Sequence, residues 1–128
     1  MSMLTLLIVD QEPDLLVLWR LAFERRGYQV LTASQATTAL DQLLGCPAPD
    51  AIIVGDLVPR PEASLGLVND LRVALVGLAV PIIMVSTQVS PTDRASGLAA
   101  GADRYLTKPL GLRAVTDTVQ SLLTLRAN

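Results

Sequence analysis

Histidine is absent from the 128 residues, and cysteine and lysine occur once each, as Cys46 and Lys108. Without histidine, the chain lacks the commonest general base and the commonest metal ligand of proteins. A single cysteine cannot form a disulfide within the chain. These absences argue against histidine-dependent catalysis, a histidine-based metal site and a disulfide-stabilised fold.

Long apolar segments and a strong charge bias are also missing. The longest nearly unbroken apolar run, residues 73–85, is interrupted by Gly77 and Pro81 and is too short to span a bilayer. The N-terminal residues do not have the pattern of a signal peptide. A net charge of −2 gives no general attraction to nucleic acid or anionic membranes. We therefore expect a cytoplasmic protein without a direct nucleic-acid or membrane partner.

The composition is that of a globular domain, with 51% hydrophobic and 17% charged residues. The length suits one domain with one core, so we expect residues 1–128 to form a single domain. Because no second domain follows Asn128, we expect either a stand-alone domain or a part of a longer chain.

Apolar segments of strand length alternate with segments of helical periodicity. The sequence predicts strands at residues 4–9, 28–33, 51–54, 81–86 and 104–107, and helices at about 13–26, 34–44, 65–76, 91–100 and 111–126. The fourth helix has a defined start, because Ser90 is a good N-cap, Pro91 suits the first helical position and Asp93 completes a capping box.

The first, third and fourth predicted strands are continuously apolar, as expected for strands covered on both faces. Alternating strands and helices predict a doubly wound parallel sheet with helices on both faces. Right-handed crossovers favour the flavodoxin-like strand order 2-1-3-4-5. In such sheets the binding site lies at the carboxyl ends of the strands, so the residues that follow each strand are the candidates.

Acids, hydroxyls and a lysine occupy these positions. The residues at the strand ends are Asp10, Gln11, Glu12, Gly55, Asp56, Ser86, Thr87, Lys108 and Pro109. Carboxylates bind magnesium, a hydroxyl donates to a phosphoryl oxygen, and an ammonium neutralises added negative charge. The set suits a hard cation together with a phosphoryl group.

Four segments resemble the receiver domain of bacterial response regulators. They are "LLIVDQEPDLL", "PDAIIVGDLVP", "PIIMVST" and "GADRYLTKPL". Each segment alone is unspecific, but four in the family's order and at its intervals are specific. The resemblance covers residues 4–125 and implies a function in two-component phosphorelay signalling.

The resemblance implies an acidic pocket after the first strand. Asp10 takes the place of the first acid, and Glu12 lies beside it in the sequence. The second acid, which is normally a direct magnesium ligand, is replaced by Gln11, which carries no charge. Asp10 is therefore the remaining charged candidate for a metal ligand at these two positions, while the Gln11 side-chain carbonyl can still ligate without charge.

The resemblance also implies roles for the residues around the last two strands. Ser86, followed by Thr87, takes the place of the switch hydroxyl, and Tyr105 that of the switch aromatic residue. Lys108 takes the place of the lysine that contacts the phosphoryl group, and Pro109 is a candidate for a cis peptide bond.

The aspartate that accepts the phosphoryl group is missing. The family's position falls on Gly55 by three separate counts, from Asp10, Asp50 and Pro59. Asp56 lies one residue later, where the alternation of a strand would turn its side chain to the opposite face, although a loop entrance relaxes this rule. The following loop, "PRPEASLG", is one residue longer than in the family.

We therefore expect a degenerate receiver that keeps the fold but is not switched by ordinary phosphorylation. Each unit-charge pair is worth about 4 kcal/mol at roughly 4 Å and an effective dielectric of about 20, so losing two acids weakens magnesium binding strongly. We expect no resident cofactor, and Mg²⁺ only if Asp56 is functional. In place of a metal, we predict that Lys108 pairs with Asp10, and Asp56 is a second candidate partner.

The resemblance implies a signalling module and not an enzyme. The implied partners are a histidine kinase, an output domain or another receiver, bound through the fourth helix, fifth strand and fifth helix, and a homodimer is an option. One alternative is an active receiver phosphorylated on Asp56 with Mg²⁺. Another is a flavodoxin-like cofactor binder, which the acidic segment "DQEPD" disfavours because a phosphate-cradling loop needs Ser, Thr or Gly there.

Overall fold

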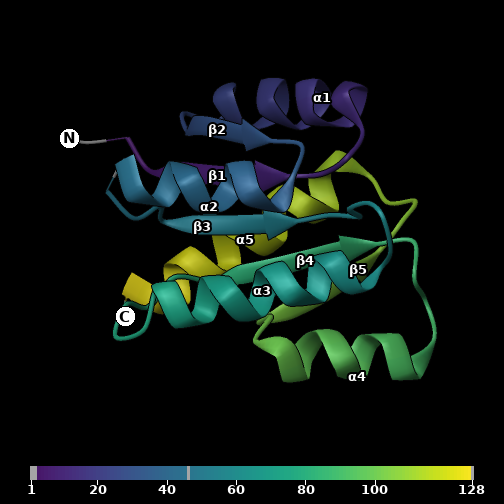
Figure 1. The fold of residues 1–128 in the computed structure, drawn as a ribbon. Helices are drawn as coiled ribbons and strands as arrows, with labels where there is room; N and C mark the ends of the chain where they lie inside the picture. The colour runs from purple at the N-terminus through teal and green to yellow at the C-terminus, as the bar shows by residue number, and fades with distance from the viewer. Residues whose placement is uncertain (1–2, 46, 128) are drawn as a thin grey trace.

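The computed structural model describes residues 3–45 and 47–127, so Cys46 lies outside the described residues (Figure 1). In the described part, the strands are β1 (Thr5–Val9), β2 (Gln29–Ala33), β3 (Ala51–Val54), β4 (Ile82–Ser86) and β5 (Arg104–Thr107). The helices are α1 (Pro13–Glu24), α2 (Ala36–Gly45), α3 (Glu62–Ala74), α4 (Pro91–Ala100) and α5 (Leu112–Ala127). The strands form one parallel sheet in the order β2-β1-β3-β4-β5, which confirms the predicted fold class.

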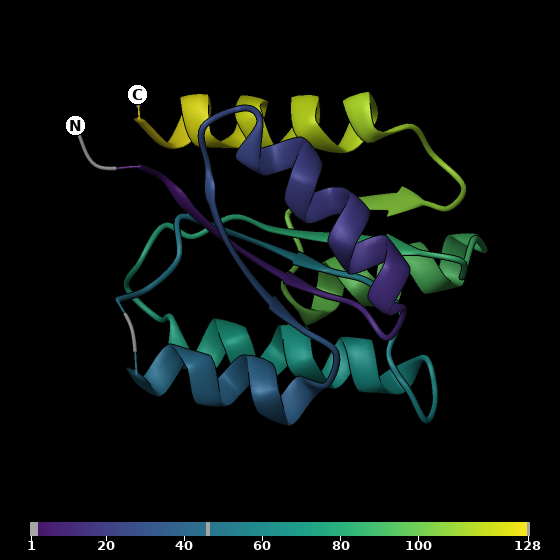
Figure 2. The same cartoon turned by 90° about the horizontal axis from the view of Figure 1, so that it is seen from above.

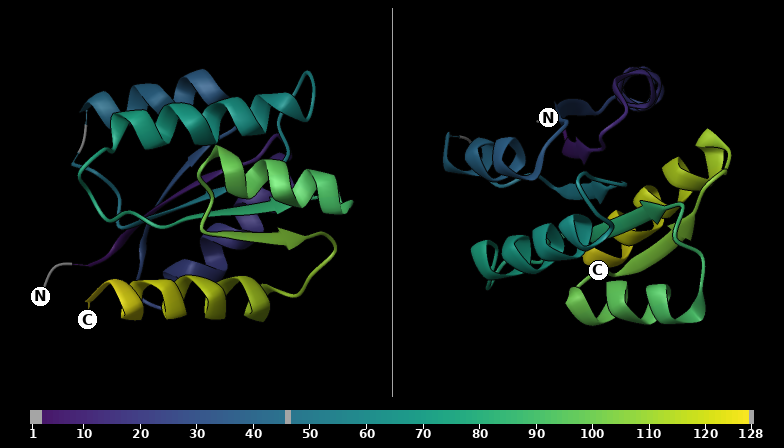
Figure 3. Two further views of the ribbon diagram at one scale, coloured as in Figure 1. Left: turned by 90° about the horizontal axis from the view of Figure 1, so that it is seen from below. Right: turned by 45° about the vertical axis from the view of Figure 1, so that its right-hand side comes forward.

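Helices cover both faces of the sheet. The helices α1 and α5 lie on one face, and α2, α3 and α4 lie on the other (Figures 2 and 3). Successive residues of β1 alternate between the two sides, so Leu6 and Ile8 pack with α1 and α5 while Leu7 and Val9 pack with α2 and α3. Because every position of β1 after the first is buried, the strand reads as a continuous apolar run.

One helix starts earlier than the sequence predicts. The helix α3 begins at Glu62, three residues before the predicted start at residue 65. Pro61 occupies the N-cap position and Glu62 places an acid in the first turn, where a helix favours negative charge. The loop between β3 and α3 therefore contains only residues 55–61. The other helix ends differ from the predictions by at most two residues, within the usual uncertainty of helix boundaries.

The predicted start of α4 is confirmed. The Ser90 hydroxyl accepts a hydrogen bond of 3.0 Å from the Asp93 backbone N–H, and the Asp93 carboxylate accepts one of 3.2 Å from the Ser90 N–H. Pro91 occupies the first turn.

In residues 3–45 and 47–127, no helix combines the length and apolar character needed to cross a membrane.

Two arginines fix the amino end of the sheet, opposite the candidate site. Arg72 of α3 donates hydrogen bonds to the carbonyl oxygens of Gly101, at 2.6 Å, and Val80, at 2.7 Å. Arg126 of α5 donates to the Asp50 carbonyl oxygen at 2.8 Å and to its carboxylate at 3.1 Å. Polar contacts at this end therefore connect helices from both faces to the loops that enter β3, β4 and β5.

Candidate functional site

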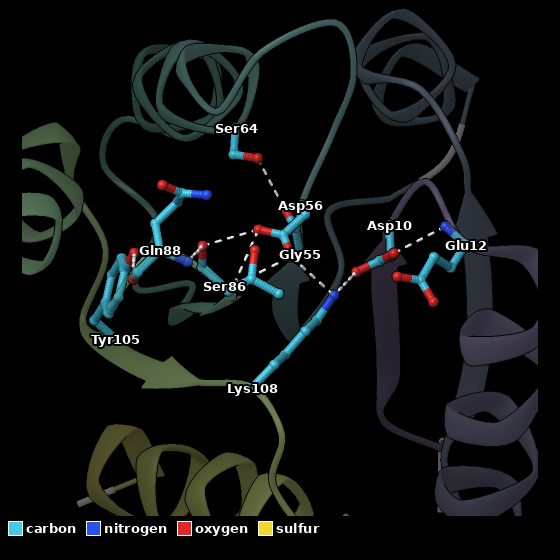
Figure 4. Close-up of polar contacts among 10 residues, drawn as sticks. Asp10, Glu12, Gly55, Asp56, Ser64, Ser86, Gln88, Tyr105 and Lys108 are labelled. Carbon is cyan, nitrogen blue, oxygen red and sulfur yellow. Dashed lines mark hydrogen bonds and ion pairs between the residues drawn. The ribbon is translucent and has the colours of Figure 1, made fainter. Parts of the chain in front are cut away.

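The carboxyl ends of four strands bring polar side chains into one crevice (Figure 4). Asp10 follows β1, Asp56 follows β3 after Gly55, Ser86 is the last residue of β4, and Lys108 follows β5. These strands are neighbours in the order β1-β3-β4-β5, so their ends share one edge of the sheet. The sequence predicts the candidate site at this same edge.

The ammonium of Lys108 lies between two carboxylates. Its Nζ is 2.8 Å from Asp10 Oδ2 and 3.2 Å from Asp56 Oδ2. The side chains of Lys108, Asp10 and Asp56 are 12%, 0% and 17% exposed, so solvent screens these pairs poorly. The predicted pair with Asp10 is present, and Asp56, the second candidate, also pairs with Lys108.

Two opposing effects act on the pKa of Lys108. Burial is the largest single effect and by itself lowers the pKa, because it disfavours the charged ammonium. The hydrogen bonds and negative charges of Asp10 and Asp56 together outweigh burial, so the pKa lies above the usual value of a lysine. The ammonium is therefore charged throughout the neutral pH range.

Asp10 is the only residue of the predicted acidic pocket whose side chain joins this network. Its Oδ1 accepts a hydrogen bond of 2.9 Å from the Glu12 backbone N–H, and its Oδ2 faces Lys108. The Glu12 side chain is exposed at the N-cap of α1 and makes no capping hydrogen bond. Gln11 contributes its backbone N–H, which donates to the Asp56 carbonyl oxygen at 3.0 Å.

Gly55 lies beside Asp10, because Val9 and Val54 are partners in the β1–β3 ladder. The Gly55 N–H continues this ladder with a hydrogen bond of 2.7 Å to the Val9 carbonyl oxygen. A Cβ atom on residue 55 would overlap Asp10 Oδ2 and would lie 2.8 Å from Asp10 Cγ. The Asp10 carboxylate therefore fills the space in which a side chain of residue 55 would begin.

Asp56 lies on the other side of the sheet from this missing side chain. Ile52 and Val54, at alternate positions before it, belong to the core beneath α2 and α3. Asp56 continues this alternation and meets Ser86, which is on the same side. The expected turn of Asp56 away from the direction of residue 55 is therefore present, yet its carboxylate still reaches the crevice.

The carboxylate of Asp56 receives three donors. Oδ1 accepts a hydrogen bond of 2.8 Å from Ser86 Oγ. The Thr87 backbone N–H lies 3.3 Å from Oδ1 and 3.2 Å from Oδ2. Lys108 Nζ approaches Oδ2 at 3.2 Å. Both oxygens are therefore engaged by groups of the chain itself.

A chain of hydrogen bonds connects this carboxylate to α4. The Gln88 N–H donates to Ser86 Oγ at 3.0 Å, and the Tyr105 hydroxyl donates to the Gln88 carbonyl oxygen at 2.6 Å. Tyr105 is 4% exposed, and a Cβ on Gly97 of α4 would lie only 2.6 Å from a carbon of its ring. Glycine at position 97 thus permits the close contact between α4 and Tyr105.

Three residues of this site were not selected from the sequence. They are Ser64, whose Oγ donates to the Gly55 carbonyl oxygen at 2.8 Å, and Gln88 and Gly97 described above. A glycine inside a helical pattern is a signal of close packing, and Gly97 carried that signal. Gln88 acts through its backbone, so its residue type gives no indication of this role.

The cis peptide bond predicted at Pro109 is present, and Val58–Pro59 is also cis.

The donor set does not fit Mg²⁺, which demands near-octahedral coordination by oxygen atoms that are free to turn toward it. The Asp10 and Asp56 carboxylates are turned to the Lys108 ammonium, and Gly55 offers no side chain. Among residues 3–45 and 47–127, no three acidic, cysteine or histidine side chains are grouped to hold a metal ion. The cation beside Asp10 in the structure is the Lys108 ammonium.

Comparison with known proteins identifies the family. Residues 6–120 match the model of the response regulator receiver domain. The chain belongs to this family. As a receiver domain of two-component signalling, it has relatives such as the transcriptional regulatory protein KdpE of Mycobacterium tuberculosis, 36% identical over 86% of this chain and 46% of that protein. The PhoP regulator of Bacillus subtilis alkaline phosphatase synthesis is 33% identical over 92% of this chain and 48% of that protein.

The receiver domain spans about half the length of these curated relatives. Solved structures share its fold over nearly the whole chain. A CheY-like receiver domain protein of Methanospirillum hungatei superposes with a TM-score of 0.88, at 23% identity and 98% coverage of both chains. The chemotaxis protein CheY4 of Vibrio cholerae gives 0.85 at 26% identity, with 94% and 99% coverage. The family match sets aside the alternative of a flavodoxin-like cofactor binder.

Replacing Gly55 by alanine tests the close contact with Asp10. The new methyl group has to displace the Asp10 carboxylate from Lys108, so we expect Gly55→Ala to lower the free energy of unfolding by about 1–3 kcal/mol. Urea denaturation measures it. The control is Gly66→Ala in α3, where an added Cβ meets no other side chain or distant backbone within 4 Å, and stability should be unchanged or higher. If the Gly55→Ala variant were as stable as the wild type, residue 55 would not be in close contact with the Asp10 carboxylate.

The pKa of Lys108 is directly measurable, because it is the only lysine and ¹³C-labelled lysine gives a single side-chain signal. We expect a titration midpoint above the ordinary value of about 10.4. Because the shift is upward, its stabilising effect is complete below the unfolded pKa and disappears as pH rises through the folded pKa.

Two Asp→Asn variants, one beside Lys108 and one remote from it, test which carboxylate raises the pKa of Lys108. Asp56→Asn removes a negative charge beside Lys108 and should lower the midpoint. Asp117→Asn alters a half-exposed carboxylate that pairs with Arg113 and should leave the midpoint unchanged. A wild-type midpoint at or below the ordinary lysine value would show that the carboxylates do not outweigh burial.

Proposed function

We propose that this receiver domain does not accept a phosphoryl group at the family's position and transmits its signal through protein contacts. The observation that carries the proposal is at Gly55, where no carboxylate is available and Asp10 fills the space of a side chain. An acyl phosphate requires a carboxylate oxygen as nucleophile, so residue 55 cannot form one. The domain then acts as a signalling module of the cytoplasm and not as an enzyme.

Phosphorylation of Asp56 is the competing function, and its geometry disfavours it. A carboxylate that attacks phosphorus needs an oxygen free to approach, but both oxygens of Asp56 accept hydrogen bonds or face Lys108. A phosphodonor also brings negative charge, which a cation must neutralise. The Lys108 ammonium is already opposed by two carboxylates, and the donor set does not fit Mg²⁺.

The proposed contact surface is the side formed by α4, β5 and α5. It carries the exposed arginines Arg94, Arg104 and Arg113, of which Arg113 also pairs with Asp117, together with the exposed Leu98. Guanidinium groups around an apolar side chain complement a partner surface that presents carboxylates. A histidine kinase, an output domain or another receiver with such a surface is the expected partner, and the names of the relatives make control of transcription the proposed context.

A phosphorylation assay separates the two functions. We expect the protein to keep its unmodified mass after incubation with acetyl phosphate and Mg²⁺, because residue 55 has no nucleophile and both oxygens of Asp56 already accept donors from the chain. Intact mass spectrometry measures this, and a receiver domain with all three acids serves as the positive control. A gain of one phosphoryl group that is absent from Asp56→Asn would establish the competing function.

A further inference from the structure

We propose that the Asp56 carboxylate is a built-in ligand of an oxyanion pocket formed by Ser86, Thr87 and Lys108, and that it keeps the domain in one arrangement without a phosphoryl group. The inference rests on the proposed function, since an Asp56 that accepted phosphate could not be a permanent ligand. The ligand in this inference is the Asp56 carboxylate, and its binding requires no metal ion.

The donors around Asp56 differ in kind but converge on one carboxylate. Ser86 supplies a hydroxyl at 2.8 Å, Thr87 a backbone N–H at 3.2 Å from the nearer oxygen, and Lys108 an ammonium at 3.2 Å. A hydroxyl, an amide and a cation that meet at one point complement a small oxyanion. The same three groups could therefore bind phosphate or sulfate if the carboxylate were removed.

The short covalent connection between Asp56 and the end of β3 favours its carboxylate over a free anion as the ligand of this pocket. Asp56 lies two residues after the end of β3, and its carbonyl oxygen is held by the Gln11 N–H at 3.0 Å. A ligand held by such a short connection competes at an effective concentration of millimolar or above, roughly, without losing further freedom on binding. A free oxyanion must displace it and also face the negative charge of Asp10, which stays in the crevice.

The occupied pocket fixes the contacts that lead to α4. Ser86 Oγ accepts from the Gln88 N–H and has one proton, which it donates to Asp56. The Gln88 carbonyl oxygen in turn holds the Tyr105 hydroxyl, whose ring packs against Gly97. Removing the carboxylate leaves Ser86 without its acceptor and releases the first link of this chain.

The test is a titration of single-lysine ¹³C-labelled protein with inorganic phosphate. We expect the Lys108 signal of the wild type to be unaffected, and that of Asp56→Ala to shift saturably, with affinity higher by about tenfold or more. Asp56→Asn keeps a side chain in the pocket without the charge and should bind phosphate less tightly than Asp56→Ala. If Asp56→Ala does not fold, Asp56→Ser opens the same pocket.

A second readout follows the contact with α4. The chain has two tyrosines, so Tyr28 is an internal reference for the ring signals of Tyr105. We expect the Tyr105 signals to change in Asp56→Ala and to return toward those of the wild type when phosphate is added. Adding Ser86→Ala to this variant should abolish the phosphate effect on both readouts.

Three results of the phosphate titration would overturn the inference. The first two are equal phosphate binding by the wild type and Asp56→Ala, and no binding by Asp56→Ala. Phosphate binding that survives Ser86→Ala would show an adventitious ion only and would also overturn it. A phosphoryl adduct on the wild type in the mass assay is a separate result, which would overturn the proposed function itself.

Discussion

The placement of the Lys108 ammonium between Asp10 and Asp56 is the interaction on which the rest of the site depends. Asp10 is fully buried, and a buried carboxylate is costly unless a cation and hydrogen bonds compensate it. The three residues belong to the ends of different strands, so only the parallel sheet brings them together. Removing the ammonium would leave two largely buried carboxylates without the cation that they share.

Glycine at position 55 is what makes this arrangement possible. A Cβ atom there would lie where Asp10 Oδ2 turns to Lys108, so the Asp10 carboxylate would have to shift. The absence of a side chain at residue 55 thus leaves room for this orientation of the Asp10 carboxylate. Asp56, on the other side of the sheet, supplies the negative charge that meets Ser86. The crevice is filled by the chain's own groups and does not fit a metal ion.

The fold and the members of the site follow from the sequence for different reasons. Buried parallel strands read as apolar runs, and the capping box marked α4, so the element order was predictable. The start of α3 was missed because the prolines around residue 60 indicated a loop, although Glu62 is a favourable first-turn residue. Asp10 and Lys108 were predictable as neighbours because parallel strand ends meet, whereas the donors from Thr87 and Gln88 are backbone groups that leave no trace in residue type.

A crystal structure of the protein grown with Mg²⁺ and beryllofluoride, a phosphoryl analogue, would show whether Asp56 stays paired with Lys108. We expect the Asp56 carboxylate to remain on Ser86 and Lys108, with Asp10 beside the ammonium and neither additive bound among these residues. Density for a cation coordinated by Asp10 and Asp56, with beryllofluoride on Asp56, would instead identify an ordinary phosphorylated switch.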